Sequence, residues 1–291
     1  MIYKKYGNTF RMLRNQKQLP LSDFSSIAPS KSTISKFERG ETMMGFDKVL
    51  ASLQIMGVSL EEFEFLLDGF TLDDAQFLMQ EIEEAIIEQN NNRLQELYKI
   101  AKNSELQYIA LTAKAYFSSL DEKEIESITD YFFSLEAWLT SDLWILSFTI
   151  RHLDIHDSLH ILDKLIADKD SIVRSTTYSY YLVKVICNAA LRLIKLGYKD
   201  YAKYLLDHIQ NSSMINISTH NFMFLQNLYN LTIGCWIFNF QERSEGKNKI
   251  EKALRIFEET GNYNLSNYYK QLIQSLLLPR QLHISTKKVS Q

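Results

Sequence analysis

The sequence predicts an all-α protein, and three observations lead to that prediction. The chain of 291 residues has three prolines, and none lies between Pro29 and Pro279. No glycine lies between Gly69 and Gly197. Because β-sandwiches and barrels use both residues in their turns, their scarcity argues strongly against an all-β fold. Apolar residues recur at helical spacing along almost the whole chain, which indicates packed amphipathic helices.

Charge is distributed unevenly along the chain. Residues 1–40 carry eight Lys or Arg against one Asp and one Glu, a net charge of +6. The whole chain carries −3, so the remaining residues sum to −9. A small basic module on an acidic body predicts an anionic partner for the N-terminus.

Residues 1–69 are predicted to form a module of five short helices. Pro20 separates the first two, and Ser30 is a good N-cap for the third. Gly40 and Gly57 follow the third and fourth helices at the position that glycine favours after a helix end. Residues 59–62 show a capping-box pattern at the start of the fifth. The predicted ranges are 3–16, 21–27, 31–39, 46–56 and 59–67.

The third predicted helix, 31–39, has an apolar and a polar face. Ile34 and Phe37 point inward, which leaves small polar and basic residues outward. The pattern resembles the helix-turn-helix of the large repressor-like DNA-binding family. The matching segments are Arg11-x-x-Arg14, Ser32-x-x-Ser35-Lys36-Phe37-Glu38-Arg39-Gly40-Glu41 and Gly57-Val58-Ser59-Leu60-x-x-Phe63.

In a helix-turn-helix, the second helix of the motif enters the major groove, and here that helix is 31–39. We expect Ser32, Thr33 and Lys36 to reach base edges, and Arg14, Lys17 and Lys36 to meet phosphates. Glu38 and Arg39 are expected to tie this helix to the first one. The alternative is a helical module for protein contacts with a solvated basic face. The candidate DNA-contacting residues are Arg14, Lys17, Lys31, Ser32, Thr33, Ser35 and Lys36.

Residues 70–278 are predicted to form an α-solenoid of degenerate tetratricopeptide-like repeats, in which antiparallel helices alternate with short polar links. Two segments resemble the turn and second helix of such a repeat. They are Gly197 with Ala202 and Leu206, and Ala253 with Phe257 and Gly261. Such stacks form a concave peptide-binding surface. Residues 279–291 are expected to be a flexible basic tail. The predicted helices are 72–89, 91–102, 105–119, 122–136, 141–153, 158–167, 171–195, 199–210, 219–239, 246–259 and 262–277.

The segment 222–240 is mostly apolar and carries no charged residue. Four amides interrupt it, so we interpret it as a buried inner helix and not as a membrane span. Asn227 and Asn230 lie three apart on one helix face. Amides donate and accept hydrogen bonds, so this pair is a candidate contact for the backbone of a peptide in the concave groove.

The basic N-terminal module, the segment Ile128-Thr-Asp-Tyr-Phe-Phe-Ser-Leu-Glu-Ala-Trp138 and the helical body together are similar to the Rgg/GadR/MutR regulators. These belong to a wider group of cytoplasmic receptors for secreted peptide pheromones. The resemblance implies a cytoplasmic homodimer that binds a palindromic promoter element and receives a short, often hydrophobic quorum-sensing peptide. It also implies that Arg151 and Asn188 face the peptide pocket, where an arginine could hold a carboxylate. A surface or capping arginine and a satisfied core amide are the alternatives.

Three histidines, His152, His156 and His160, are spaced four apart. A zinc site would need them on one helix face, but residues 154–157 look like a break between helices. A second hypothesis is that they gain charge near pH 6 and alter peptide affinity. Solvated histidines are the simplest interpretation.

No catalytic motif is present: the chain has no G-x-S-x-G, P-loop or H-E-x-x-H pattern. We therefore expect no enzyme activity, no cofactor and no bound metal. Cys187 and Cys235 lie in apolar helical surroundings and are interpreted as small buried side chains. The sequence is consistent with two functions: a DNA-binding regulator controlled by a peptide, and a peptide- or protein-binding adaptor that does not act on DNA.

Overall fold

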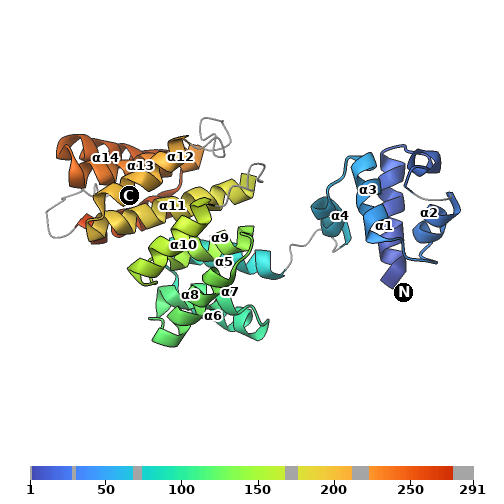
Figure 1. Cartoon of the computed structure of the whole chain (residues 1–291), viewed down its shortest axis with the longest axis horizontal. Coiled ribbons are helices and arrows are strands. Elements are labelled where there is room, and N and C mark those ends of the chain that lie inside the picture. Colours follow the sequence, from blue (N-terminus) through green and yellow to red (C-terminus); the bar gives the residue numbers. More distant parts are fainter. Residues whose placement is uncertain (1, 28–30, 68–73, 168–175, 212–222, 278–291) are drawn as a thin grey trace, which may run out of the picture. The chain divides into compact units, whose positions relative to one another are not determined.

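The computed structural model describes residues 2–27, 31–67, 74–167, 176–211 and 223–277. Within those ranges every regular element is a helix, which confirms the all-α fold class. The chain divides into two compact units, Met1–Phe77 and Leu78–Gln291. The division falls inside one helix, α5 (Asp74–Ile87), and the two units are described separately (Figure 1). The predicted tail, 279–291, lies outside the described residues.

The N-terminal unit contains four α-helices and one short 3-10 helix: α1 (Ile2–Gln16), η1 (Leu21–Phe24), α2 (Lys31–Glu38), α3 (Phe46–Met56) and α4 (Leu60–Leu67). Its core gathers side chains from each of them, including Phe10, Phe24 and Phe37. The Phe10 ring lies 5.4 Å from that of Phe37 in an edge-to-face arrangement. The predicted second helix, 21–27, is shorter than expected, because the structure has a 3-10 helix only over Leu21–Phe24. The predicted N-cap at Ser30 lies outside the described residues.

Close packing of α1 against α2 depends on Gly7. A Cβ added there would lie 1.9 Å from the Phe37 carbonyl oxygen, a distance that no side chain tolerates. Gly40, at φ +72°, then ends the turn after α2 in the left-handed conformation that glycine favours. The predicted capping box of α4 is present, because Ser59 N donates to Glu62 at 2.7 Å and Glu62 N donates to Ser59 Oγ at 3.0 Å.

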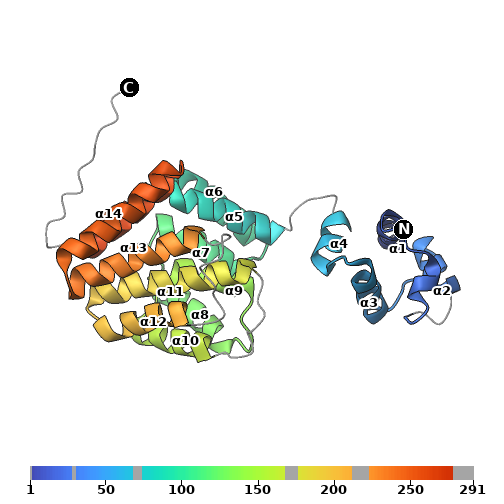
Figure 2. The ribbon, with the colours of Figure 1, turned by 90° about the horizontal axis from the view of Figure 1, so that it is seen from above.

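The C-terminal unit continues from α5 as a stack of mostly antiparallel helices, with α13, α11 and α12 side by side (Figure 2). Gly197 and Gly261 have positive φ and follow α11 and α14, as the repeat-like pattern predicts. The helices are α6 (Asn91–Asn103), α7 (Gln107–Phe117), α8 (Glu122–Ser134), α9 (Thr140–Thr149), α10 (Ile155–Ala167), α11 (Thr176–Leu196), α12 (Lys199–Asn211), α13 (Met223–Phe240), α14 (Arg243–Glu259) and α15 (Tyr263–Leu277).

Helix α13 is an inner helix, as its apolar composition predicts. It packs closely on α14, where a Cβ added at Gly246 would lie 2.3 Å from the Phe238 nitrogen. Among the described helices, none combines the length and hydropathy needed to cross a membrane. Cys187 and Cys235 are buried free thiols, and burial raises the pKa of each to about 12. Both therefore stay protonated, as expected for packing residues.

Candidate DNA-binding helix and ligand groove

Helix α2 presents the polar face that the sequence predicts. Ile34 and Phe37 are buried in the core of the N-terminal unit, whereas Ser32 and Lys36 are exposed one helical turn apart. Thr33 and Ser35 are half-buried beside them. The side chain of Lys31 lies outside the described residues. The geometry thus gives α2 a polar outer face, and the DNA contacts assigned to it stay a prediction.

Arg14 is not placed as a phosphate contact, which corrects the sequence-based assignment. Its guanidinium makes two bonds to the Glu38 carboxylate, at 2.6 Å and 3.0 Å, and donates to the Leu19 carbonyl at 2.8 Å. The two charged side chains are only 12% and 6% exposed. Because the guanidinium faces the protein, Arg14 joins α1 to α2. Lys17, by contrast, is exposed.

The prediction for Glu38 is confirmed by this ion pair, whereas the prediction for Arg39 is wrong. Arg39 pairs with Glu41 at 2.5 Å and donates to Ser35 Oγ at 2.5 Å, so its partners are local and not on the first helix. The pair is exposed, with about half of each side chain accessible. Its contribution to stability is accordingly small.

A cavity of about 300 Å³ opens in the C-terminal unit between α7, the end of α9, α11 and α15. A second cavity of about 400 Å³ shares Tyr116, Arg151, Tyr268 and Leu272 with it and extends to α5 and α6. We call the two together the ligand groove. None of the residues that line either cavity is acidic. The first cavity is lined by Tyr116, Ser147, Ile150, Arg151, Asn188, Leu191, Arg192, Lys195, Leu196, Tyr268 and Leu272.

Arg151 lies at the junction of the two cavities. Its guanidinium carbon is 4.2 Å from the centre of the Tyr116 ring, a cation–π contact. The Tyr116 hydroxyl donates to the Phe148 carbonyl at 3.3 Å, which holds that ring in place. Arg151 Nε is buried and has no hydrogen-bond partner in the described part of the chain. A cation is therefore held in the groove with unused donor capacity.

Asn188, on α11, reaches the same cavity. Its Nδ2 donates to the Ser147 carbonyl at 2.7 Å, which orients the side-chain amide. Its Oδ1 is buried and accepts no hydrogen bond from the described residues. The structure thus brings Arg151 and Asn188 together, with one free donor and one free acceptor. Their contact with a peptide stays a prediction.

The amide pair of α13 does not line the groove, contrary to expectation. Asn227 is buried, and its Nδ2 donates to the Ala253 carbonyl of α14 at 2.8 Å. Asn230 is half-buried and accepts a bond from Gln226 at 3.4 Å. Neither residue lines either cavity. Asn227 instead fastens α13 to α14 through its Nδ2, while its Oδ1 is buried without a hydrogen-bond partner among the described residues.

Arg192 is a groove residue that the sequence analysis missed. It donates to the Ile150 and Leu153 carbonyls, which follow α9, and to Ser158 Oγ at 2.8 Å. A cation at a helix C-terminus binds carbonyls that have no partner within the helix. Arg192 lies four residues after Asn188, so helical spacing places it on the same face. This spacing could have identified Arg192 as a groove residue from the sequence.

The three histidines do not form one cluster. His152 precedes α10, whereas the exposed His156 and His160 lie on it, which agrees with the expected break. Burial lowers the pKa of His152 to about 4, aided by the charges of Arg151 and Arg192. His152 therefore stays neutral near pH 6, and the pH hypothesis is wrong for this residue. In the described ranges no group of three side chains is placed to bind a metal.

Comparison with known proteins places this geometry in a family. Residues 76–271 match the model of the C-terminal domain of the HTH-type transcriptional regulator Rgg. The solved SHP pheromone receptor Rgg2 of Streptococcus dysgalactiae is 24% identical, over 93% of this chain and 99% of that one, with a TM-score of 0.69. A putative transcriptional regulator from Listeria monocytogenes EGD-e is 18% identical, over 94% and 98%, with a TM-score of 0.74.

A third similar structure is that of the PrgX/iCF10 complex, at 15% identity over 94% of this chain and 96% of that one, with a TM-score of 0.70. At these identities the solved structures show a shared fold. The family match covers well over half of the sequence and includes the motif of residues 128–138. The chain therefore belongs to the Rgg family of HTH-type transcriptional regulators.

Proposed function

We propose that this protein is a sequence-specific DNA-binding regulator whose DNA affinity is set by a short peptide in the ligand groove. The N-terminal module, 1–69, binds promoter DNA through α2. The body, 70–278, binds the peptide and forms a homodimer, and the protein acts in the cytoplasm. No catalytic step and no cofactor are needed for this role.

The observation that carries the proposal is the pair of unused polar groups in the groove. A peptide unit presents one carbonyl acceptor and one N–H donor. Arg151 Nε is a free donor and Asn188 Oδ1 a free acceptor, and both residues line one cavity. Most buried polar atoms in native proteins have a partner. Among the unpartnered ones of the described residues, these two lie in one open cavity, so the pair points to a ligand that completes it.

The groove also has the size and lining of a ligand site. Its two cavities, about 300 Å³ and 400 Å³, fall in the range of small-ligand pockets. Leu191, Leu196 and Leu272 supply apolar surface, while Arg151 and Lys195 supply positive charge. A hydrophobic peptide with a carboxylate matches this combination. The pheromone receptor Rgg2 and the PrgX/iCF10 complex share the fold, which supports the same use.

Fluorescence polarisation on the full chain tests both halves of the proposal. A labelled duplex with the DNA upstream of the gene is titrated at 50 mM and 200 mM salt; affinity should fall steeply, since each phosphate contact releases counterions. Synthetic hydrophobic peptides encoded beside the gene are then added. Peptide should change DNA affinity, and DNA should change peptide affinity by the same factor.

The groove assignment is tested by Arg151→Gln and Asn188→Ala, each of which should weaken peptide binding about tenfold. Arg255→Gln, which changes an exposed arginine on α14, is the matched control and should bind peptide like the wild type. Peptide binding without DNA binding would favour the adaptor instead. Equal peptide affinity of all three variants would remove the groove from the proposal.

A further inference from the structure

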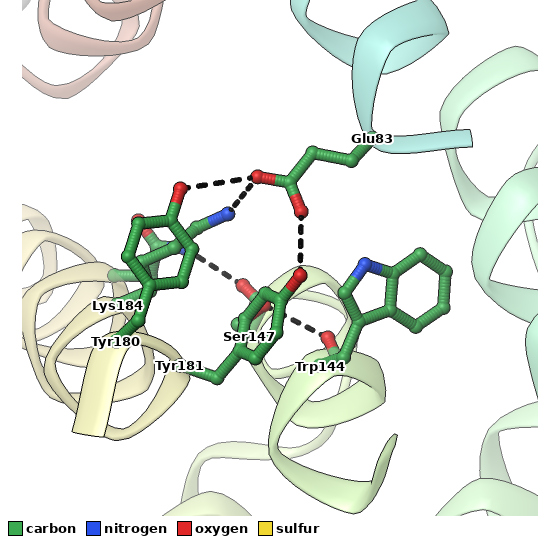
Figure 3. A network of polar contacts seen from close by, with 7 residues as sticks. Glu83, Trp144, Ser147, Tyr180, Tyr181 and Lys184 are labelled. Atoms are coloured by element: carbon green, nitrogen blue, oxygen red, sulfur yellow. Dashed lines mark hydrogen bonds and ion pairs between the residues drawn. The ribbon is translucent and has the colours of Figure 1, made fainter. Parts of the chain in front are cut away.

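A buried ion pair lies beside the groove but does not line it. Lys184 of α11 donates to Glu83 of α5 at 2.5 Å, and the two side chains are 5% and 13% exposed. The hydroxyls of Tyr180 and Tyr181 donate to the same carboxylate at 3.4 Å and 3.3 Å. Figure 3 shows these three side chains of α11 gathered around the Glu83 carboxylate.

Such a pair is poorly explained by stability alone. Burial lowers the pKa of Lys184, and the charge of Glu83 opposes that shift only in part. Replacing a buried pair by apolar residues is often neutral or stabilising, because removing two charges from water offsets their attraction. What the pair provides is a fixed orientation: it holds α5 against one position on α11.

The groove and the ion pair share one short segment of α9. Asn188 lies one helical turn after Lys184 and donates to the Ser147 carbonyl at 2.7 Å. The next residue, Phe148, places its ring 4.5 Å from the Lys184 ammonium. The Phe148 carbonyl accepts from Tyr116, over which Arg151 is stacked. Both proposed ligand contacts therefore reach the residues around Lys184 through direct contacts.

Helix α5 joins this network to the rest of the chain. It carries Glu83, and one turn later its Ile86 lines the second cavity of the groove. The boundary between the two compact units falls within the same helix, after Phe77. A change in the groove that alters Ser147 or Phe148 thus acts on a helix that leads, along the chain, to the N-terminal unit.

We propose that the Glu83–Lys184 pair couples occupancy of the groove to the position of α5, and through α5 to the DNA affinity of the N-terminal unit. This inference rests on the proposed function, because it assumes that groove and DNA are both used. The inference adds the contact that transmits the signal. This contact joins the Glu83 carboxylate on α5 to the Lys184 ammonium on α11.

A double-mutant cycle on the full chain tests the coupling. The four proteins are the wild type, Asn188→Ala, Lys184→Met and the double variant, and the readout is the Kd for the labelled upstream duplex in the presence of the same concentration of synthetic hydrophobic peptide. Each single change should shift this Kd at least about threefold, while the double variant should match Lys184→Met within about 1.5-fold. Additive effects, or no effect of Asn188→Ala in either background, would overturn the coupling.

Hydrogen exchange of α5 provides a second readout. In Lys184→Met the amides of α5 should exchange at least about tenfold faster than in the wild type. Lys203→Met, which breaks an exposed pair with Asp207 on α12, should leave both readouts unchanged. If circular dichroism shows that Lys184→Met is unfolded, Glu83→Gln replaces it in the cycle.

Failure of the proposed function would give a different experimental result from failure of the coupling. A wild-type chain that binds neither the upstream duplex nor a randomised one at low salt overturns the regulator itself, and the coupling with it. A wild type that binds DNA, together with additive variants or unchanged exchange of α5, overturns the coupling alone.

Discussion

The two units of this protein place their polar residues in opposite ways. In the N-terminal unit, the face of α2 assigned to DNA is accessible, and the strong ion pair between Arg14 and Glu38 is internal. In the C-terminal unit, the groove residues Arg151 and Asn188 are themselves partly enclosed. The proposed function accounts for this difference, because a duplex needs an accessible surface, whereas a short peptide needs a concave site.

Arginines show the difference most clearly. Arg14 and Arg192 use their donors on carboxylate or carbonyl oxygens of their own unit. Arg151 stacks on Tyr116 and keeps a buried Nε without a partner in the described residues. A buried donor without a partner, and not the residue type, therefore separates a candidate ligand contact from a structural arginine.

The largest effect is expected for Arg14→Met. Removing one partner leaves the Glu38 carboxylate buried and unpaired, so the N-terminal unit should lose about 3 kcal/mol of stability. Hydrogen exchange of the α1 and α2 amides in the full chain measures this loss. The double variant Arg14→Met/Glu38→Leu should regain most of it, because no uncompensated charge remains.

The same variant tests whether Arg14 contacts Glu38 or a DNA phosphate. Unchanged exchange of α1 and α2, together with weaker DNA binding and a smaller salt dependence, would mean that Arg14 meets a phosphate after all. Loss of protection without the double-variant recovery would show that the arginine contributes packing and not charge.

The second effect concerns the end of α9. Arg192→Met removes the donor to Ile150, Leu153 and Ser158, so buried carbonyls lose their partner. We expect a loss of about 2 kcal/mol in the free energy of unfolding of the C-terminal unit. Urea titration followed by tryptophan fluorescence measures it, since Trp138, Trp144 and Trp236 all lie in that unit.

Lys195→Met provides the matched control, because Lys195 is an exposed cation at the rim of the same groove. A change of less than about 0.5 kcal/mol is expected there. Equal losses in the two variants would show that positive charge in the groove, and not the capping of α9, is what stabilises the unit.

The third effect is a dependence of stability on pH. His152 has a folded pKa of about 4, below its ordinary value of 6.5, so the unfolded chain binds a proton first as the pH falls. The stability from neutral His152 is complete above pH 6.5 and is lost toward pH 4. Between pH 7 and pH 4.5 the wild type should lose about 2 kcal/mol more than His152→Phe.

His156→Gln is the control for this measurement, because it also removes an imidazole near α9 and α10, but an exposed one. If His152→Phe keeps the full acid sensitivity of the wild type, carboxylates and not this imidazole cause the loss.

The sequence was sufficient where a function depends on one helix, and insufficient where it depends on several. The apolar spacing of Ile34 and Phe37 is enough to place Ser32 and Lys36 on the outer face of α2. The same reasoning failed for Asn227, because an inner helix has neighbours on every side, and periodicity does not say which neighbour an amide meets. Arg151 and Asn188 came from the family resemblance, and only tertiary structure shows which of their atoms are free.

The smallest effects are expected for single changes on the outer face of α2, which test the proposed role of the N-terminal unit alone. Lys36→Ala removes one exposed charge from α2, so the slope of log affinity against log salt should become shallower by about one and binding should weaken on all duplexes alike. Thr33→Ala should instead change the preference at one base pair and leave the slope unchanged.

Lys99→Ala is the control, because it alters an exposed lysine of α6 and should bind DNA like the wild type. Because a phosphate contact carries no sequence information, a base-specific change in Lys36→Ala would assign Lys36 to a base edge. If Lys36→Ala and Lys99→Ala have the same slope as the wild type, α2 is not the DNA-binding surface, and the contrast between an exposed DNA site and an enclosed ligand site fails at its N-terminal half.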